Sequence, residues 1–207
     1  MGNLTYQNKD GKNKLENFEW DSTWIDYAND NTHKRVLYIG DSISKTTRDL
    51  AEEIMHGEVY FDRFGTSKGI DNPYFKDSIS LFAKQLPKVD VILFNNGLHG
   101  WHLSDDDEYA FYYENMIKYL LDSYKNSPLY IVLSTHVKNP ERANRVMKRN
   151  ESAKMIANKY SLPVIDLYSL SKENENFLTS DGVHFLEEGY KIFALEITDI
   201  LYRDIVG

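Results

Sequence analysis

Short apolar runs alternate with longer amphipathic stretches from residue 35 to the end of the chain. The runs are rich in Val, Ile, Leu and Phe, as expected of strands buried on both faces, and occupy residues 36–39, 59–64, 91–94, 129–134 and 164–166. Helical periodicity marks residues 46–56, 73–86, 105–124, 142–160 and 186–202. Five buried strands separated by helices predict a parallel sheet in an α/β sandwich.

The start of the chain has a different pattern. Residues 3–14 are polar and rich in Asn and Lys, which predicts an N-terminal arm over residues 1–30. We expect Trp20 and Trp24 to pack this arm onto the rest of the protein; the alternative is that one of them lines a sugar site. No repeat and no Pro/Gly-rich linker divides residues 31–207, so we predict a single domain there.

Composition and charge narrow the classes of partner. The chain has 207 residues, 42% of them hydrophobic, and a net charge of −8 with its Lys and Arg residues scattered. It therefore lacks the basic patch of a nucleic-acid or anionic-membrane binder, and we expect a neutral or weakly charged substrate. There is no cysteine, which excludes disulfides and thiol catalysis. No apolar stretch approaches the ~18 residues of a membrane span, so we expect a soluble protein, cytoplasmic or secreted after removal of a leader.

Polar residues with catalytic chemistry follow the predicted strands. Ser42 comes after the first strand, and His136 follows the fourth. Asp181 and His184 lie in the loop before the last helix. In open α/β sheets, ligands bind outside the carboxyl ends of the strands, so we expect these groups to meet at one edge of the sheet.

Ser42, His184 and Asp181 are the three residue types that make a hydroxyl nucleophilic at neutral pH. Ser42 needs an adjacent base, which His184 can supply, and Asp181 can orient the imidazole. The N–H of Ser42 lies where a strand turns into a helix, a favourable place for a developing oxyanion. Each residue also has a purely structural explanation, because Ser and Asp are common helix N-caps and His184 could lie at the surface.

The motifs Gly40-Asp41-Ser42-Ile43 and Asp181-Gly182-Val183-His184-Phe185 resemble those of the SGNH/GDSL hydrolase superfamily, over about residues 35–201. The resemblance implies a flavodoxin-like three-layer sandwich with a five-stranded parallel sheet. It also implies that Ser42 is the nucleophile, His184 the general base and Asp181 its orienting acid, with no metal or organic cofactor.

Two oxyanion donors are implied on the main chain. One is the N–H of Ser42. The other is a glycine N–H in the loop after the second strand, where Gly65 and Gly69 are both candidates and we favour Gly65.

The third donor departs from the family pattern. It is usually an Asn side chain in a Gly-X-Asn-Asp motif, and His99 falls at that position here. The run Phe94-Asn95-Asn96-Gly97-Leu98-His99 resembles a variant subset of the superfamily. His99, Asn95 and Asn96 are therefore all candidate donors, although an Asn pair can simply satisfy turn backbone and His99 can be a buried structural group.

Further residues near these motifs are candidate substrate contacts. They are Asp41, Trp101, His102 and His136, the last of which could equally be a loop residue at the rim. The acidic run at residues 105–107, near His99 and His102, invites a metal site. We expect none, because acidic side chains are favoured at the N-terminus of the helix predicted there.

The sequence thus predicts a serine esterase that hydrolyses a small acyl ester, most simply an acetyl ester of a carbohydrate, through an acyl-Ser42 intermediate. Transfer of the acyl group to another alcohol would use the same intermediate. The alternatives are an esterase acting on lipid or lysophospholipid acyl esters, and a non-catalytic carbohydrate- or partner-binding module on the same fold.

Overall fold

A computed structural model of the chain describes residues 14–206. Within these residues a single sheet has six strands in the order β1-β3-β2-β4-β5-β6. The strands are β1 (Asp21–Trp24), β2 (Lys34–Gly40), β3 (Val59–Thr66), β4 (Val91–Phe94), β5 (Leu129–Val132) and β6 (Val164–Ile165). Strands β2 to β6 are parallel, which confirms the five predicted strands and the α/β sandwich. The sixth strand, β1, pairs antiparallel with β3 and was not predicted.

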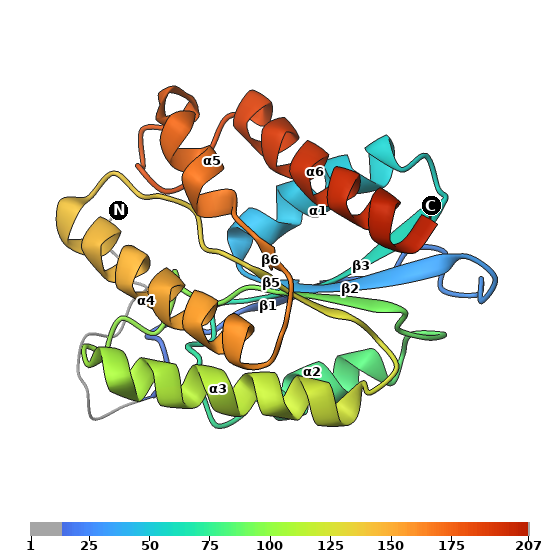
Figure 1. The fold of residues 1–207 in the computed structure, drawn as a ribbon, viewed down its shortest axis with the longest axis horizontal. Helices are drawn as coiled ribbons and strands as arrows, with labels where there is room; N and C mark the ends of the chain where they lie inside the picture. Colours follow the sequence, from blue (N-terminus) through green and yellow to red (C-terminus); the bar gives the residue numbers. More distant parts are fainter. Residues whose placement is uncertain (1–13, 207) are drawn as a thin grey trace.

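Helices cover both faces of the sheet (Figure 1). They are α1 (Ser42–Ile54), α2 (Phe75–Ala83), α3 (Asp106–Ser123), α4 (Pro140–Lys159), α5 (Leu167–Glu173) and α6 (Glu187–Leu201), with a 3-10 turn (Glu175–Phe177) and a π-helical turn (Tyr202–Val206). Helices α1, α5 and α6 lie on one face, and α2 and α3 lie on the other, with α4 beside α3. The five predicted helices are all present, and the short α5 is additional.

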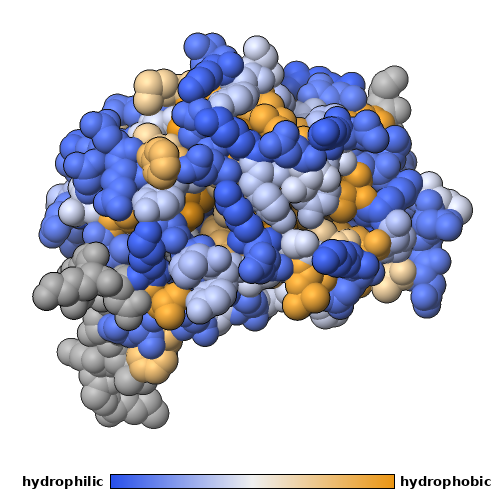
Figure 2. Space-filling model, turned by 90° about the horizontal axis from the view of Figure 1, so that it is seen from below, coloured by the Kyte–Doolittle hydropathy of each residue, from blue (hydrophilic) through white to orange (hydrophobic). Residues whose placement is uncertain are grey.

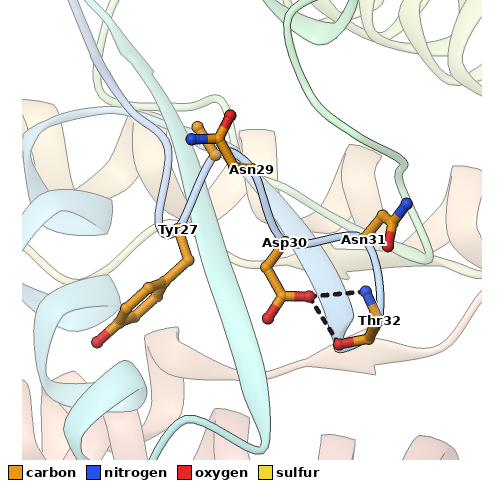
Figure 3. A pocket seen from close by; sticks show the side chains of 6 residues that line it. Tyr27, Asn29, Asp30, Asn31 and Thr32 are labelled. Carbon is orange, nitrogen blue, oxygen red and sulfur yellow. Dashed lines mark hydrogen bonds between the residues drawn. The ribbon is translucent and has the colours of Figure 1, made fainter.

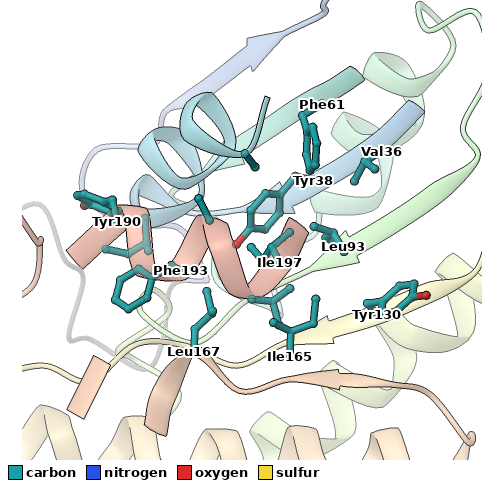
Figure 4. Packing of buried hydrophobic residues seen from close by; sticks show 14 of the residues in the cluster. Val36, Tyr38, Phe61, Leu93, Tyr130, Ile165, Leu167, Tyr190, Phe193 and Ile197 are labelled. Atoms are coloured by element: carbon teal, nitrogen blue, oxygen red, sulfur yellow. The ribbon is translucent and has the colours of Figure 1, made fainter. Parts of the chain in front are cut away.

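The two faces of the sheet form two hydrophobic cores. Alternate residues of β2 point to opposite faces: Val36 and Tyr38 belong to the core under α1 and α6, whereas Leu37 and Ile39 belong to the core over α2 and α3. Figure 4 shows the first core, in which strand side chains such as Tyr38 face Phe193 and other residues of α6. Burial on both faces explains why the strands read as apolar runs without alternation.

The sheet begins inside the predicted N-terminal arm. Strand β1 pairs Asp21 with Thr66 and Trp24 with Arg63, so the expected boundary at residue 30 does not coincide with an edge of the sheet. The buried guanidinium of Arg35 bonds both carboxylate oxygens of Asp62, at 2.9 and 2.8 Å. It also donates to the carbonyl of Asp30 in the loop between β1 and β2, and so fixes that loop to the sheet. Residues 1–13 of the predicted arm lie outside the described residues.

The surface seen in Figure 2 is mostly hydrophilic, with hydrophobic residues in small separate groups. None of the described helices is both long enough and apolar enough to cross a membrane.

Candidate active site

The fold joins three side chains at the carboxyl edge of the sheet. Ser42 is the first residue of α1, directly after β2, and His184 lies in the loop before α6. Ser42 Oγ lies 2.8 Å from His184 Nε2, although the two residues are 142 positions apart. His184 Nδ1 lies 2.7 Å from Asp181 Oδ2. A continuous Ser–His–Asp hydrogen-bond chain results.

Asp181 and His184 lie in one tight turn, which places the carboxylate next to the imidazole. Asp181 Oδ1 accepts hydrogen bonds from the N–H groups of Val183 (2.8 Å) and His184 (3.0 Å) and from the hydroxyl of Thr179 (2.7 Å). Gly182 has a φ of +70°, a conformation that favours glycine. One oxygen of Asp181 therefore holds the turn while the other holds the imidazole.

These hydrogen bonds also set the charge of Asp181. Partial burial raises the pKa of its carboxyl, but the bonds from His184, Val183 and Thr179 outweigh burial and hold the pKa below its ordinary value. Asp181 is ionised at neutral pH and can stabilise a protonated imidazole.

Asp41, not Ser42, caps helix α1. Asp41 Oδ1 accepts the N–H of Ile43 at 2.9 Å, and its side chain is buried. Burial raises the pKa of this carboxyl to about 6, against the opposing effects of the Ile43 N–H and His184. Because the capping position is taken, the structural explanation of Ser42 as an N-cap is wrong, and its hydroxyl is directed to His184 instead. Asp41 does not line the hollow described next.

A hollow of about 320 Å³ opens above Ser42 and His184. Its described lining residues are Glu16, Phe18, Trp20, Ser42, Ser67, His99 and His184. Trp20 therefore lines the hollow, which is the alternative considered for one of the two tryptophans. Trp24 does not line it and is 53% exposed. Ser67 follows the second predicted strand, as expected of a residue at this edge. Glu16 and Phe18 were not predicted, because no local pattern indicates that the N-terminal segment lies across this edge of the sheet.

A larger depression, of about 500 Å³, lies at the Tyr27–Thr32 loop (Figure 3). Asp30 there accepts two hydrogen bonds from Thr32, both at 2.7 Å, which hold the loop in shape. The Thr32 hydroxyl also lies 3.1 Å from His33 Nδ1, but the same ring nitrogen faces Asp30, so no chain runs from hydroxyl through imidazole to carboxylate as it does at Ser42. The smaller hollow at Ser42 is therefore the candidate active site.

Of the three side chains considered as oxyanion donors, the structure brings His99 to the hollow. Its ring meets Trp20 edge-on, with the ring centroids 5.9 Å apart. Burial, together with the smaller effects of the charges of Arg149 and His184, lowers the pKa of His99 to about 4. The imidazole is therefore neutral at pH 7 and carries one N–H.

The amides of Asn95 and Asn96 are used elsewhere. Asn95 Nδ2 donates to the carbonyl of Val132 (2.8 Å) and to Ser134 Oγ (3.1 Å), which ties β4 to β5. Asn96 Nδ2 donates to the carbonyl of Lys68 (3.0 Å). Neither residue lines the hollow, in agreement with the structural alternative considered for this pair.

The glycine preferred from the sequence lies in the wrong place for a loop donor. Gly65 is inside β3, between Gly40 of β2 and Ser22 of β1, where backbone groups serve the sheet. The expectation that it lies in the loop after the strand is wrong. Gly69 does lie in that loop and packs against Gly100, and a Cβ on Gly69 would come within 2.8 Å of the Gly100 Cα. Only glycines allow these two loops to touch.

Arg149 holds the loop that carries His99. Its guanidinium is buried in α4 and donates to four carbonyls of this loop: Gly97 (2.9 Å), His99 (2.6 Å), Gly100 (2.6 Å) and Leu103 (3.2 Å). Sequence reasoning missed this residue, because it stands in the middle of a helix without any motif.

The other predicted contacts lie away from the hollow. Trp101 is only 8% exposed and packs under the guanidinium groups of α4, the nearest at 5.1 Å. His102 is buried against Asp71, with Nε2 2.9 Å from both carboxylate oxygens. His136 lies near Glu175, 3.4 Å away. The expected substrate wall of Trp101 and His102 is therefore not formed, and His136 does not reach the hollow.

The acidic run at residues 105–107 serves the start of α3, as expected. Asp105 Oδ1 accepts the N–H of Glu108 at 2.8 Å, and Asp106 and Asp107 lie in the first turn. Among residues 14–206, no group of three or more His, Asp and Glu residues is placed to hold a metal ion.

Comparison with solved structures shows which proteins share this fold. A lipase/acylhydrolase from Enterococcus faecalis matches with a TM-score of 0.65 and 19% sequence identity, over 81% of this chain and 95% of that chain. A member of the lipolytic protein G-D-S-L family from Veillonella parvula matches with a TM-score of 0.65 and 17% identity, over 82% and 99% of the two chains. The acetyl xylan esterase AlAXEase matches with a TM-score of 0.62 and 19% identity, over 81% and 99%.

No protein-family model matches the chain, and no curated protein matches it by sequence. The likeness therefore lies in the fold, which agrees with the architecture implied by the two sequence motifs. The chain has the fold of the SGNH/GDSL hydrolases.

Proposed function

We propose that the chain is a serine esterase, with Ser42 as nucleophile, His184 as general base and Asp181 as orienting acid. The observation that carries the proposal is the Ser42–His184–Asp181 hydrogen-bond chain at the floor of a hollow, with distances of 2.8 and 2.7 Å. A non-catalytic module gives no reason for this alignment, since Asp41 already caps the helix.

The reaction proceeds through an acyl-enzyme. His184 Nε2 accepts the Ser42 proton as Oγ attacks the ester carbonyl, and Asp181 stabilises the imidazolium. His184 then donates that proton to the leaving alcohol as the C–O bond breaks. In the second half, His184 takes a proton from water, the hydroxide attacks the acyl carbon, and Ser42 regains its hydrogen when the acid leaves.

Three N–H groups are proposed to stabilise the oxyanion. The N–H of Ser42 lies in the first turn of α1, where the positive end of the helix dipole favours negative charge. Gly69 replaces Gly65 as the backbone donor, since it lies in the loop after β3. The N–H of the neutral His99 side chain is the third donor, because this side chain alone among the three candidates lines the hollow.

The substrate proposed is a small acyl ester of a carbohydrate, with acetyl as the acyl group. The described lining combines two aromatic residues, Phe18 and Trp20, with polar groups, and includes no Leu, Ile or Val. A groove for a long lipid chain would need such aliphatic side chains. One of the proteins that share the fold is named as an acetyl xylan esterase, which supports the same choice.

The test is acid release from p-nitrophenyl esters of increasing chain length, with Ser42→Ala as control, together with labelling by a fluorophosphonate probe. We expect the acetyl ester to be preferred and Ser42 to be labelled in a one-to-one ratio. A folded protein that is neither labelled nor active would contradict the esterase, and a preference that rises with chain length would contradict the acetyl assignment.

A further inference from the structure

The N-terminal segment of residues 14–20 forms one wall of the hollow. Glu16, Phe18 and Trp20 all line it, and they are spaced two residues apart. The segment bends at residues 15, 17 and 18, and along this irregular path the three side chains share one hollow with Ser42 and His184.

Hydrogen bonds fix this segment to the loop after β3. Trp20 N–H donates to Ser67 Oγ (2.8 Å), and Ser67 N–H donates to the Trp20 carbonyl (3.0 Å). The carboxylate of Glu19 accepts from Asn72 Nδ2 (3.1 Å). The segment is therefore held at its carboxyl-terminal end by both main-chain and side-chain contacts.

Glu16 ties the same segment to the loop after β4. Its Oε1 accepts the N–H of Gly100 at 2.8 Å and lies 3.9 Å from His99 Nδ1. The segment thus spans both loops proposed to supply oxyanion donors. A wall anchored on both sides is placed to select the substrate, because bound groups must fit between it and the catalytic side chains.

The side chains on this wall suit an uncharged sugar. Phe18 is 46% exposed and Trp20 is partly exposed, so both rings offer apolar surface next to the nucleophile. Aromatic rings pack against apolar faces, which pyranose rings carry on their C–H side. The buried carboxylate of Glu16 gives the wall a negative charge, which disfavours an anionic ligand.

We propose that the wall formed by Glu16, Phe18 and Trp20 is the subsite for the alcohol part of the substrate, and that it takes a neutral pyranose ring stacked on Phe18 and Trp20. That the bound sugar is the alcohol part of a substrate rests on the proposed esterase function. Binding of the sugar ester to the wall does not depend on catalysis. An acetyl group fills only a small part of a hollow of about 320 Å³, which leaves room for the ring.

The test separates binding from chemistry. Full-length Ser42→Ala protein is titrated with an acetylated methyl xylopyranoside by calorimetry, alone and combined with Phe18→Ala or Trp20→Ala. We expect each added change to raise Kd by roughly 3- to 10-fold, the range for loss of one ring contact. Phe111→Ala is the matched control, because this aromatic side chain is 62% exposed on α3 and does not line the hollow.

In protein that keeps Ser42, we compare kcat/KM for the sugar acetate with kcat/KM for ethyl acetate. Phe18→Ala and Trp20→Ala are each expected to lower this ratio by the same roughly 3- to 10-fold factor by which they raise Kd. The proposal is overturned if the Ser42→Ala protein does not bind the sugar acetate, or if Phe111→Ala weakens binding as much as Phe18→Ala. If binding follows the proposal but the wild-type protein hydrolyses no ester, the esterase function fails and the sugar subsite stands.

Glu16→Gln tests the charge of the wall. Glutamine keeps an oxygen that can accept the Gly100 N–H, so the loop contact is preserved. We expect the variant to bind an acetylated glucuronic acid several-fold more tightly and the neutral sugar acetate about as before. An unchanged preference for the neutral sugar would show that Glu16 does not select against charge.

Discussion

Replacement of His99 by glutamine should change how the stability of the protein depends on pH. Glutamine has a similar length and an N–H donor, but it does not titrate. Burial lowers the pKa of His99 to about 4 in the folded chain, whereas an exposed histidine titrates near 6.5. The unfolded chain therefore binds the proton more readily than the folded chain between these two pH values.

The sign and size of the effect follow from that difference. The contribution of neutral His99 to stability is fully present above about pH 6.5 and is lost as the pH falls toward 4. Each pH unit between the two pKa values corresponds to about 1.4 kcal/mol, which gives about 3 kcal/mol at most. The side chain is 18% exposed, so solvent screens part of this, and we expect about 1–3 kcal/mol.

The assay is urea unfolding of the wild-type protein and His99→Gln, followed by tryptophan fluorescence, at pH 7, 5 and 4. Asp41 has a raised pKa of about 6, so its contribution has the opposite sign and is lost as the pH rises through about 6. Taking the difference between variant and wild type removes this and every other shared titration. His56→Gln, at an exposed histidine, is the control.

We expect the free energy of unfolding of His99→Gln to gain on that of the wild type as the pH falls, while His56→Gln stays parallel to it. A constant difference between pH 7 and pH 4 for His99→Gln would refute the reasoning, because it would mean that folding does not desolvate the imidazole.

The remaining predictions concern the same edge of the sheet. His99→Ala should lower kcat for p-nitrophenyl acetate by roughly 10²–10³, the usual loss for one oxyanion donor, whereas Asn96→Ala should lower it less than tenfold; the reverse order would assign the donor to Asn96. Arg149→Met should lower the free energy of unfolding by about 3–5 kcal/mol, measured by urea denaturation, because four loop carbonyls lose a buried charged donor; a loss below 1 kcal/mol would refute that role. Asp41→Asn should gain in stability relative to the wild type as the pH rises from 4 to 7, in thermal melts at fixed ionic strength, and a parallel profile would contradict the raised pKa.

The sequence predicts most of the sandwich because its signal is local. Strands buried on both faces are continuous apolar runs, and β4 occupies the predicted residues 91–94. Strand β1 contains the sequence Asp-Ser-Thr-Trp, which has no such run, and it forms because the edge of β3 is available for pairing. Its existence depends on pairing with β3, from Trp24↔Arg63 to Asp21↔Thr66, and periodicity cannot detect a partner so far along the chain.

The site was predictable to the extent that topology fixes it. Strand ends of a parallel sheet meet at one edge, so the meeting of Ser42 with His184 followed from order along the chain. The choice between Gly65 and Gly69 depended on where β3 ends, a boundary that shifts by a residue or two in any sequence analysis. The choice between Asn95 and His99 depended on side-chain rotamers and on hydrogen-bond partners in β5, which the sequence does not give. The position of Phe18 at the hollow depended on the path of a segment without regular structure.

The turn that carries Asp181 and His184 determines the orientation of the catalytic imidazole relative to its carboxylate. Within residues 14–206, every hydrogen bond of Asp181 is made to a residue two or three positions away, so the orientation of the imidazole is set locally. Loosening elsewhere in the molecule changes how far this preassembled unit stands from the serine, but not how acid and base face each other. The Ser42–His184 hydrogen bond then depends on how this short turn packs against the end of β2.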